Sequence, residues 1–273
     1  MAWLVVLSSG FGASAAGADE VIRFREAWGW AVVVPVALGA SGAVHELLLD
    51  TGTTSTILEP GLATELGLAV VARANLVTPA GVRPVGVGRL DLALGSRRLD
   101  DVEVLIAELP AVRSDQPGVR GILGQSALAR LEYTIDHARR RIVVHGRSAA
   151  ASTRDAPVRP TLDVRLGCGR AAVRLVLDSG VATPVLFESG GRSPGLELEL
   201  GGRVDAATNA GDAVWREGRL ASLCVAGRRA GPVSVVVRPS DAPARAEHGL
   251  LPSRYFARVR LGPDGAVLAV EHW

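Results

Sequence analysis

The sequence predicts an all-β protein built from two copies of one small domain. Glycine is frequent, with 32 residues among 273, while aromatic residues make up only 4% of the chain, a balance typical of many short strands joined by tight turns. Apolar runs of strand length are separated by segments rich in glycine and small polar residues. Short motifs also recur 128 residues apart, a period that fits a duplicated domain and is too long for a solenoid.

The duplication is visible as matched segments in the two halves of the chain. At the offset of 128 residues, the matches are Val36–Gly39 with Val164–Gly167, Gly121–Leu123 with Gly249–Leu251, and Leu128 with Phe256. Between these anchors the offset drifts to 130 or 131, as for Gly88–Leu90 with Gly218–Leu220 and Val102–Val104 with Val233–Val235. A drift that returns to its starting value is what loop insertions in one copy produce, so we expect both halves to repeat one order of elements.

The elements of the first copy follow from its turn residues. Residues 31–36 and 44–49 flank Gly39–Gly42 and predict a hairpin. Residues 59–67 predict a short helix, with Pro60 near its start and Gly67 at its end. Further strands are expected between residues 76 and 109, then a helix at 124–131 and a closing hairpin of 133–135 with 141–144. The second copy repeats this order and ends on a strand at 267–270.

Domain boundaries follow from composition. Residues 1–18 read as a signal peptide, because Leu4–Leu7 is apolar and Ala16–Ala18 has the small residues that precede a cleavage site. No positive charge precedes Leu4, so a misassigned start or a disordered tail is the alternative. We expect an exported protein, periplasmic or secreted, with a first copy at 19–146, a small and polar linker at 147–159 and a second copy at 160–273. No later stretch has the roughly 18 consecutive apolar residues of a membrane helix.

Charge and cysteine content limit the other functions. The formal net charge is +2 and the basic residues are all arginine. Their runs are too short to line a nucleic-acid backbone, so no nucleic-acid partner is expected.

Cys168 and Cys224 both lie in the second half. They form either a disulfide, if the protein is exported, or two buried free thiols. Because the histidines are scattered and none lies near the cysteines, the sequence predicts no metal site.

Two aspartates carry the chemistry that the sequence predicts. Asp50 follows the apolar run Leu47–Leu49, and Asp178 follows the matching run Leu175–Leu177. Two carboxyl groups brought together at the ends of two strands cannot both ionise at low cost, so they share one proton. The ionised member can then act as general base on a water molecule while the protonated member polarises a carbonyl group. This chemistry needs no cofactor.

The residues after each aspartate support that pairing. Thr51 and Ser179 place a hydroxyl group where it can hydrogen-bond across the interface of the two copies. Gly52 and Gly180 allow tight turns that present backbone N–H groups to the carboxylates. Thr53 follows the first triplet, whereas Val181 follows the second. A hydroxyl group at Thr53 would stabilise the charged form of Asp50, so we expect Asp50 to be the more acidic member.

These motifs resemble those of the retropepsin-like aspartic proteases in the bacterial form with two fused lobes. Leu47–Thr53 and Gly121–Gly124 are similar to the family's catalytic loop and its later glycine element, and Leu175–Val181 and Gly249–Pro252 match the same elements in the second lobe. The likeness covers roughly residues 30–146 and 160–273. It implies two tandem acid-protease β-barrel lobes related by a pseudo-two-fold axis, with the active site between them, flaps over a cleft, and hydrolysis of peptides.

The resemblance implies two flaps, and one position of the second copy departs from the family pattern. The flap candidates are residues 78–81 and 208–211, with Gly81 and Gly211 allowing mobile tips. Trp215 follows the second of these segments and either covers the cleft or packs within a strand. Pro252 stands where the first copy has Gly124, so that backbone position departs from the family pattern.

The leading functional prediction is an aspartic endopeptidase that acts on a peptide or protein substrate with the Asp50/Asp178 dyad. A monomer suffices for this mechanism, because each lobe supplies one aspartate. The first alternative is a peptide-binding or scaffold protein that keeps the fold without turnover. The second is a dimer in which the lobes pair between chains.

Overall fold

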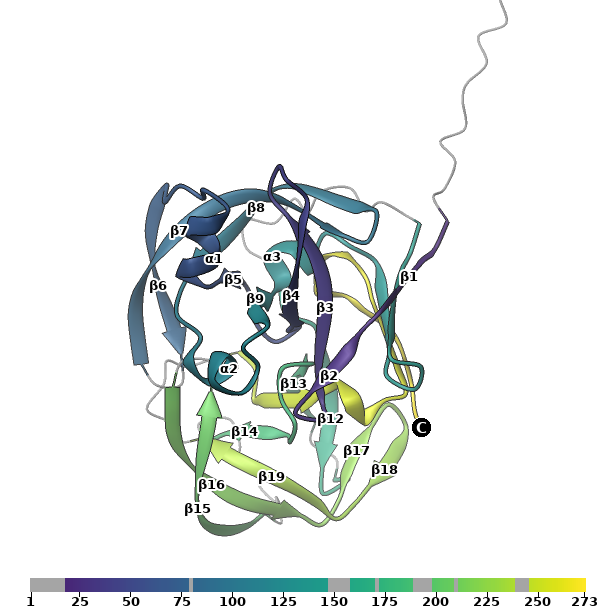
Figure 1. The fold of residues 1–273 in the computed structure, drawn as a ribbon. Coiled ribbons are helices and arrows are strands. Elements are labelled where there is room, and N and C mark those ends of the chain that lie inside the picture. Colours follow the sequence, from purple (N-terminus) through teal and green to yellow (C-terminus); the bar gives the residue numbers. More distant parts are fainter. Residues whose placement is uncertain are drawn as a thin grey trace, which may run out of the picture.

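The structure is a computed structural model that describes residues 18–78, 81–146, 158–169, 172–188, 198–208, 211–238 and 246–273. Its elements are mainly strands with a few short helices, which confirms the all-β prediction (Figure 1). Within these ranges the strands form sheets of eight, nine and five members. None of the helices described there has the length and apolar character needed to cross a membrane.

The eight-stranded sheet comes from the N-terminal half. Its strands lie in the order β2 (Arg25–Ala27), β3 (Ala31–Leu38), β4 (Ala43–Leu49), β9 (Val119–Leu123), β5 (Thr56–Leu58), β8 (Arg97–Ile106), β7 (Gly81–Leu94) and β6 (Ala72–Thr78). The pairs β4–β9 and β5–β8 are parallel, and β5–β9 is antiparallel. The helices α1 (Pro60–Glu65), α2 (Pro110–Asp115) and α3 (Gln125–Leu128) belong to this half.

The nine-stranded sheet comes from the C-terminal half and repeats that order. Its strands are β15 (Leu198–Thr208), β16 (Gly211–Leu220), β19 (Val233–Arg238), β14 (Val185–Phe187), β20 (Gly249–Pro252), β13 (Val173–Asp178), β12 (Thr161–Leu166), β17 (Leu223–Val225) and β18 (Arg228–Ala230). The parallel pairs β13–β20 and β14–β19 stand where β4–β9 and β5–β8 stand in the first sheet. The main difference is that the long β7 reaches β3, whereas in the second sheet the separate strand β17 pairs with β12.

A five-stranded sheet joins the two halves. Its order is β1 (Glu20–Arg23), β11 (Arg141–Val144), β10 (Tyr133–Asp136), β21 (Arg258–Leu261) and β22 (Val267–Glu271). Strands β10 and β21 come from matching positions of the two copies and pair antiparallel, with Tyr133 opposite Leu261. We call this the joining sheet. Its backbone hydrogen bonds fix the position of one half against the other.

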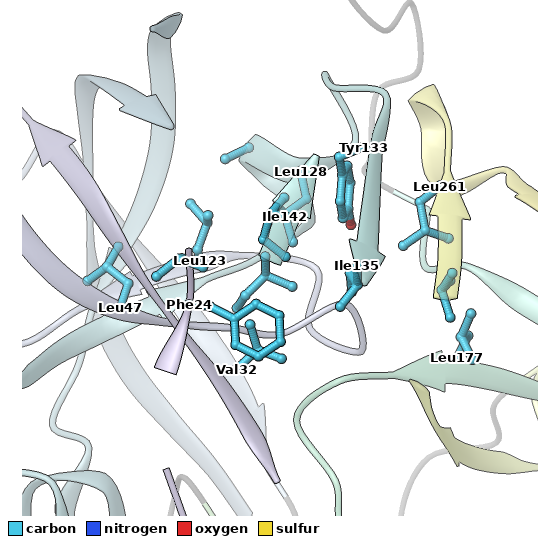
Figure 2. Packing of buried hydrophobic residues seen from close by; sticks show 14 of the residues in the cluster. Phe24, Val32, Leu47, Leu123, Leu128, Tyr133, Ile135, Ile142, Leu177 and Leu261 are labelled. Carbon is cyan, nitrogen blue, oxygen red and sulfur yellow. The ribbon is translucent and has the colours of Figure 1, made fainter. Parts of the chain in front are cut away.

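The main core runs through both halves and the joining sheet. Figure 2 shows Leu47 of β4 and Leu123 of β9 on one side, with Ile135 of β10 and Leu177 of β13 farther along the same cluster. A second, smaller cluster lies in the N-terminal half only, and its members include Ala31, Val33, Leu48, Val119 and Ile122. The second cluster packs against partly buried side chains of β6 and so supports the β6–β7 hairpin.

Several local expectations hold and others need correction. The β3–β4 hairpin and the β10–β11 hairpin form as expected. Helix α1 begins at Pro60, and Gly67 after it has the positive φ of +63° that lets the chain turn away. The expected helix at 124–131 is shorter, covering only Gln125–Leu128, and its counterpart in the second copy is the 3-10 turn Ser253–Tyr255. A further 3-10 turn covers Pro263–Gly265.

Some expectations fall on residues outside the described ranges. These are nearly all of the signal segment (1–17), most of the linker (147–157) and the tips of both flap candidates (79–80 and 209–210). The signal peptide, the linker and the domain boundaries therefore stay predictions.

Candidate active site

The two aspartates lie at equivalent places in the two sheets. Asp50 directly follows β4, and its backbone N–H donates to the carbonyl of Leu123 at the end of the parallel strand β9 (3.0 Å). Asp178 is the last residue of β13 and lies opposite Pro252 of the parallel strand β20. Each carboxyl group thus emerges where a parallel pair of strands ends, which is where the repeat in the sequence led us to expect it.

Reciprocal hydrogen bonds lock the two aspartate loops together. The Thr51 hydroxyl group donates to the Leu177 carbonyl (2.7 Å), and the Ser179 hydroxyl group donates to the Leu49 carbonyl (2.7 Å). Each hydroxyl oxygen also accepts the backbone N–H of the other residue, at 3.0 Å in both directions. Both side chains are buried. Four bonds of this kind hold the loops in one relative position.

The glycines of the triplets give each carboxyl group room against the opposite loop. A Cβ atom on Gly180 would lie 2.7 Å from Cγ of Asp50, and one on Gly52 would overlap the carboxyl group of Asp178. Any larger residue would therefore displace the opposite carboxyl group. The two aspartate side chains are also hydrogen-bonded to each other.

The surroundings of the two carboxyl groups differ in a way that separates their acidities. Burial raises the pKa of both, and the negative charge of Asp50 lifts the pKa of Asp178 well above its usual value. Asp50 accepts N–H groups from Gly52 (2.9 Å) and Thr53 (3.2 Å), whereas Asp178 accepts the N–H of Gly180 (2.6 Å). Donors to the charged form favour ionisation, so the geometry favours an ionised Asp50 beside a protonated Asp178. The Thr53 donor is its backbone N–H, whereas the sequence had led us to expect the hydroxyl group.

Two residues that support the Asp50 loop, Gln125 and Thr56, were not singled out from the sequence, whereas Gly124 was. The buried Gln125 side chain donates through Nε2 to the carbonyl of Thr51 (2.9 Å). The backbone N–H of Gly124 donates to the Thr56 hydroxyl group (3.2 Å), and a Cβ atom at Gly124 would overlap the backbone of Ser55. The signal that could have identified Gln125 is its place just after the repeated glycine element.

The C-terminal counterpart of Gln125 is Ser253, and it makes a different contact. Its hydroxyl group lies 3.0 Å from Nε2 of His137, which follows β10 in the N-terminal half. Both side chains are buried. This pair therefore links the end of β20, beside Asp178, to the joining sheet.

The flap candidates form hairpins. Gly81 begins β7 opposite Thr78, and Gly211 begins β16 opposite Thr208. In the view of Figure 1 both hairpins lie at the left of the molecule. Trp215 lies within β16 opposite Val204 and is half-buried, a position that both alternatives for this side chain allow. Movement of these hairpins over a bound peptide stays a prediction.

The two cysteines are joined in a disulfide. Cys168 lies in the turn after β12, and Cys224 lies in β17 opposite Arg165 of β12. The bond therefore attaches the strand that has no separate counterpart in the first sheet. Within the described ranges, no three His, Cys, Asp or Glu side chains gather as a metal site requires.

Comparison with known families agrees with this geometry. Residues 34–127, which run from β3 through Asp50 to α3, match the model of a family described as aspartyl protease. No curated protein matched the chain. Over residues 34–127, about a third of its length, the chain is therefore similar to the aspartyl proteases of this family.

Proposed function

We propose that this protein is an aspartic endopeptidase that hydrolyses peptide bonds with a water molecule activated by Asp50 and Asp178. The observation that carries the proposal is the contact of two buried carboxyl groups, each lying against the glycine of the opposite triplet. Two carboxyl groups that share one proton are the known catalytic feature of aspartic proteases as a class.

The proposed reaction assigns a role to each carboxyl group. Ionised Asp50 accepts a proton from the water, whose oxygen forms a bond to the carbonyl carbon of the peptide. Protonated Asp178 donates a hydrogen bond and then its proton to the carbonyl oxygen, so that the tetrahedral intermediate carries no net charge. The C–N bond then breaks, the leaving amine takes the proton held by Asp50, and Asp178 regains a proton as the carbonyl reforms.

We further propose that the two halves act as two lobes of one catalytic unit, so that a monomer is sufficient. The matched strand orders of the two large sheets and the β10–β21 pairing within the joining sheet support this arrangement. The substrate would be a peptide or protein in an exported, periplasmic or secreted setting. Sedimentation at several concentrations would distinguish the monomer from a dimer whose lobes pair between chains.

Cleavage of a mixed peptide library between pH 3 and 8 tests the function. We expect the wild type to cleave and both Asp50→Asn and Asp178→Asn to lose activity by about 100-fold or more, the scale of general acid–base catalysis. The matched control is Asp163→Asn, because Asp163 is an exposed carboxylate on β12 whose partner is Arg174 (3.4 Å). A folded wild type that binds peptides without cleaving them would refute the enzyme and favour the peptide-binding or scaffold alternative.

A further inference from the structure

An arginine lies opposite Asp178 on the neighbouring strand. Strands β12 and β13 are antiparallel, and their register continues past the start of β12, because the N–H of Leu177 donates to the carbonyl of Pro160 (2.8 Å). With Pro160 opposite Leu177, the next residue outward on each strand brings Arg159 opposite Asp178. Its guanidinium group is close enough to act electrostatically on both Asp50 and Asp178.

A glutamate from the other side of β13 holds this arginine. Nη2 of Arg159 lies 2.7 Å from Oε1 of Glu247, and the two side chains are only 17% and 15% exposed. Glu247 lies two residues before β20, the strand that runs parallel to β13 and ends beside Asp178. Because the pair is largely shielded from solvent, salt screens its field less than that of a surface pair.

The ion pair has no counterpart on the Asp50 side. At the offset of 128 residues, Arg159 corresponds to Ala31 and Glu247 to Val119. Both of these are buried, at 2% and 0% exposure, in the small apolar cluster of the N-terminal half. At these matching positions, the half that carries Asp50 has two apolar residues, whereas the half that carries Asp178 has two charged residues.

We propose that Arg159, held in place by Glu247, is a positioning residue of the reaction that favours the ionised form of the dyad and so moves the pH range in which the pair carries one charge to lower pH. This inference rests on the proposed function for its role in catalysis. The positive charge of Arg159 acts against burial, which raises the pKa of both aspartates, and it lowers both values. Because Glu247 is bonded to the guanidinium group, we expect its negative charge to offset part of that effect.

Two other ionisable residues, His248 and Asp264, lie close to the ion pair in the chain or in the fold. His248, next to Glu247, accepts the backbone N–H of Arg174 through Nδ1 (3.3 Å) and donates its own N–H to the Arg174 carbonyl. Asp264 lies on the 3-10 turn whose Gly265 packs against the carbonyl of Val158, and its Oδ1 is buried without a hydrogen-bond partner. Arg159 is the charged residue of this group that acts on both carboxyl groups, and Glu247 is bonded to it.

Titration of the aspartate carboxyl carbons by NMR tests the proposal without requiring turnover. The full chain, labelled with ¹³C at the aspartate carboxyl groups, is titrated as wild type, Arg159→Met, Glu247→Gln and the double variant. Asp50→Asn and Asp178→Asn assign the two signals. An opposite charge at close range moves a carboxyl pKa by about 1–3 units, and the glutamate cancels part of it, so a shift of roughly 0.5–1 unit is expected.

The two single variants should shift the dyad in opposite directions. Arg159→Met removes the positive charge and leaves Glu247 unpaired, so the titration of the dyad should move to higher pH. Glu247→Gln leaves the arginine unopposed, so the titration should move to lower pH, and the double variant should fall between them. The control is Arg174→Met, which removes an equal charge from β13 at an exposed pair (3.4 Å to Asp163) and should shift nothing.

The possible outcomes separate this inference from the proposed function. Shifts in the same direction, or shifts no larger than that of the control, would overturn the role of the ion pair even if the enzyme cleaves peptides. Opposite shifts without cleavage by any variant would leave the electrostatic role standing and refute the endopeptidase. If Arg159→Met does not fold, Glu247→Gln and the charge-conserving Arg159→Lys, expected to remain near the wild type, decide the question.

Discussion

Thr51 and Ser179 bind each other across the two halves of the chain, each accepting the backbone N–H of the other on its hydroxyl oxygen at 3.0 Å. Each hydroxyl group donates in turn to a carbonyl of the opposite half, so no donor or acceptor of this set depends on water. Removing one member of such a buried hydrogen-bonded set lowers the stability of the fold strongly, because its partners stay buried without a hydrogen bond. The alignment of the two aspartate loops therefore depends on two side chains.

Replacing Thr51 by valine should lower the free energy of unfolding by about 2–5 kcal/mol. The change keeps the shape of the side chain but leaves the Leu177 carbonyl and the Ser179 N–H unpaired, at about 1–3 kcal/mol each. Urea denaturation measures the effect. Thr64→Val is the control, since the Thr64 hydroxyl group donates to the Pro60 carbonyl (3.0 Å) at an exposed site, and it should change stability by less than about 0.5 kcal/mol. Equal effects of the two changes would contradict the importance of the buried link.

Gly52→Ala should reduce peptide cleavage by about 100-fold, the scale expected when a reacting group is displaced by about an ångström. The new methyl group would overlap the carboxyl group of Asp178, which must then move away from Asp50. The control is Gly202→Ala on β15, where a Cβ atom meets no heavy atom within 4 Å. Full activity of Gly52→Ala would mean that the two carboxyl groups do not need this contact.

Reduction of the Cys168–Cys224 disulfide should lower the free energy of unfolding by up to about 4 kcal/mol. The bond closes a loop with a sequence separation of 56 residues, and the loss of loop-closure entropy in the unfolded chain scales with that length. Thermal unfolding with and without reductant measures the effect, with the Cys168→Ser/Cys224→Ser variant as the insensitive control. A wild type that unfolds at the same temperature with the disulfide reduced would contradict the prediction.

The features that the sequence could predict are local ones. The glycine turn at 39–42 predicts the β3–β4 hairpin. The apolar runs before Asp50 and Asp178 are followed by turn-forming residues, which predict where those strands end. The joining sheet could not be derived in this way, since the pairing of Tyr133 with Leu261 depends on how two complete domains meet. Helix α2 was not predicted although Pro110 marks its start, because six residues are too few to show the apolar period of a helix.

The same limit applies to the candidate site. The triplets named both aspartates and their supporting hydroxyl groups, because the repeat aligned them. The Arg159–Glu247 pair was not visible, since Arg159 lay in a segment read as linker and Glu247 lies 88 residues away. The two side chains meet only in the folded sheet, where β12 and β20 flank β13.

Asp178→Asn should make the protein more stable at pH 7 than the wild type. The pKa of Asp178 is raised well above its usual value, first by burial and then by the charge of Asp50. The folded state therefore holds a proton that the unfolded state releases, and this contribution to stability is lost as pH rises from about 4 through the folded pKa. The amide of the variant does not titrate, so the variant does not lose this stability as the pH rises. Urea midpoints between pH 3.5 and 7.5 should thus converge at acid pH and separate at neutral pH; a constant difference would contradict the burial of a shared proton.

His137 should impose the opposite pH dependence. Burial lowers its pKa to about 4, so between that value and the ordinary value near 6.5 the unfolded chain binds a proton that the folded state excludes. Stability from this group is therefore present above about pH 6.5 and is lost as the pH falls to about 4, by about 3 kcal/mol in all.

The variant His137→Gln isolates that contribution. Glutamine does not titrate, so the variant should lose less stability on acidification than the wild type, although the loss of packing against Phe24 lowers its stability at pH 7. His272→Gln, at a half-exposed site, should keep the pH dependence of the wild type. His137 contacts Ser253, which follows the strand beside Asp178, so acid unfolding at this contact should also end peptide cleavage. We therefore expect His137→Gln to cleave peptides at lower pH than the wild type does. Identical acid limits for the wild type and the variant would assign the loss of folding to other groups.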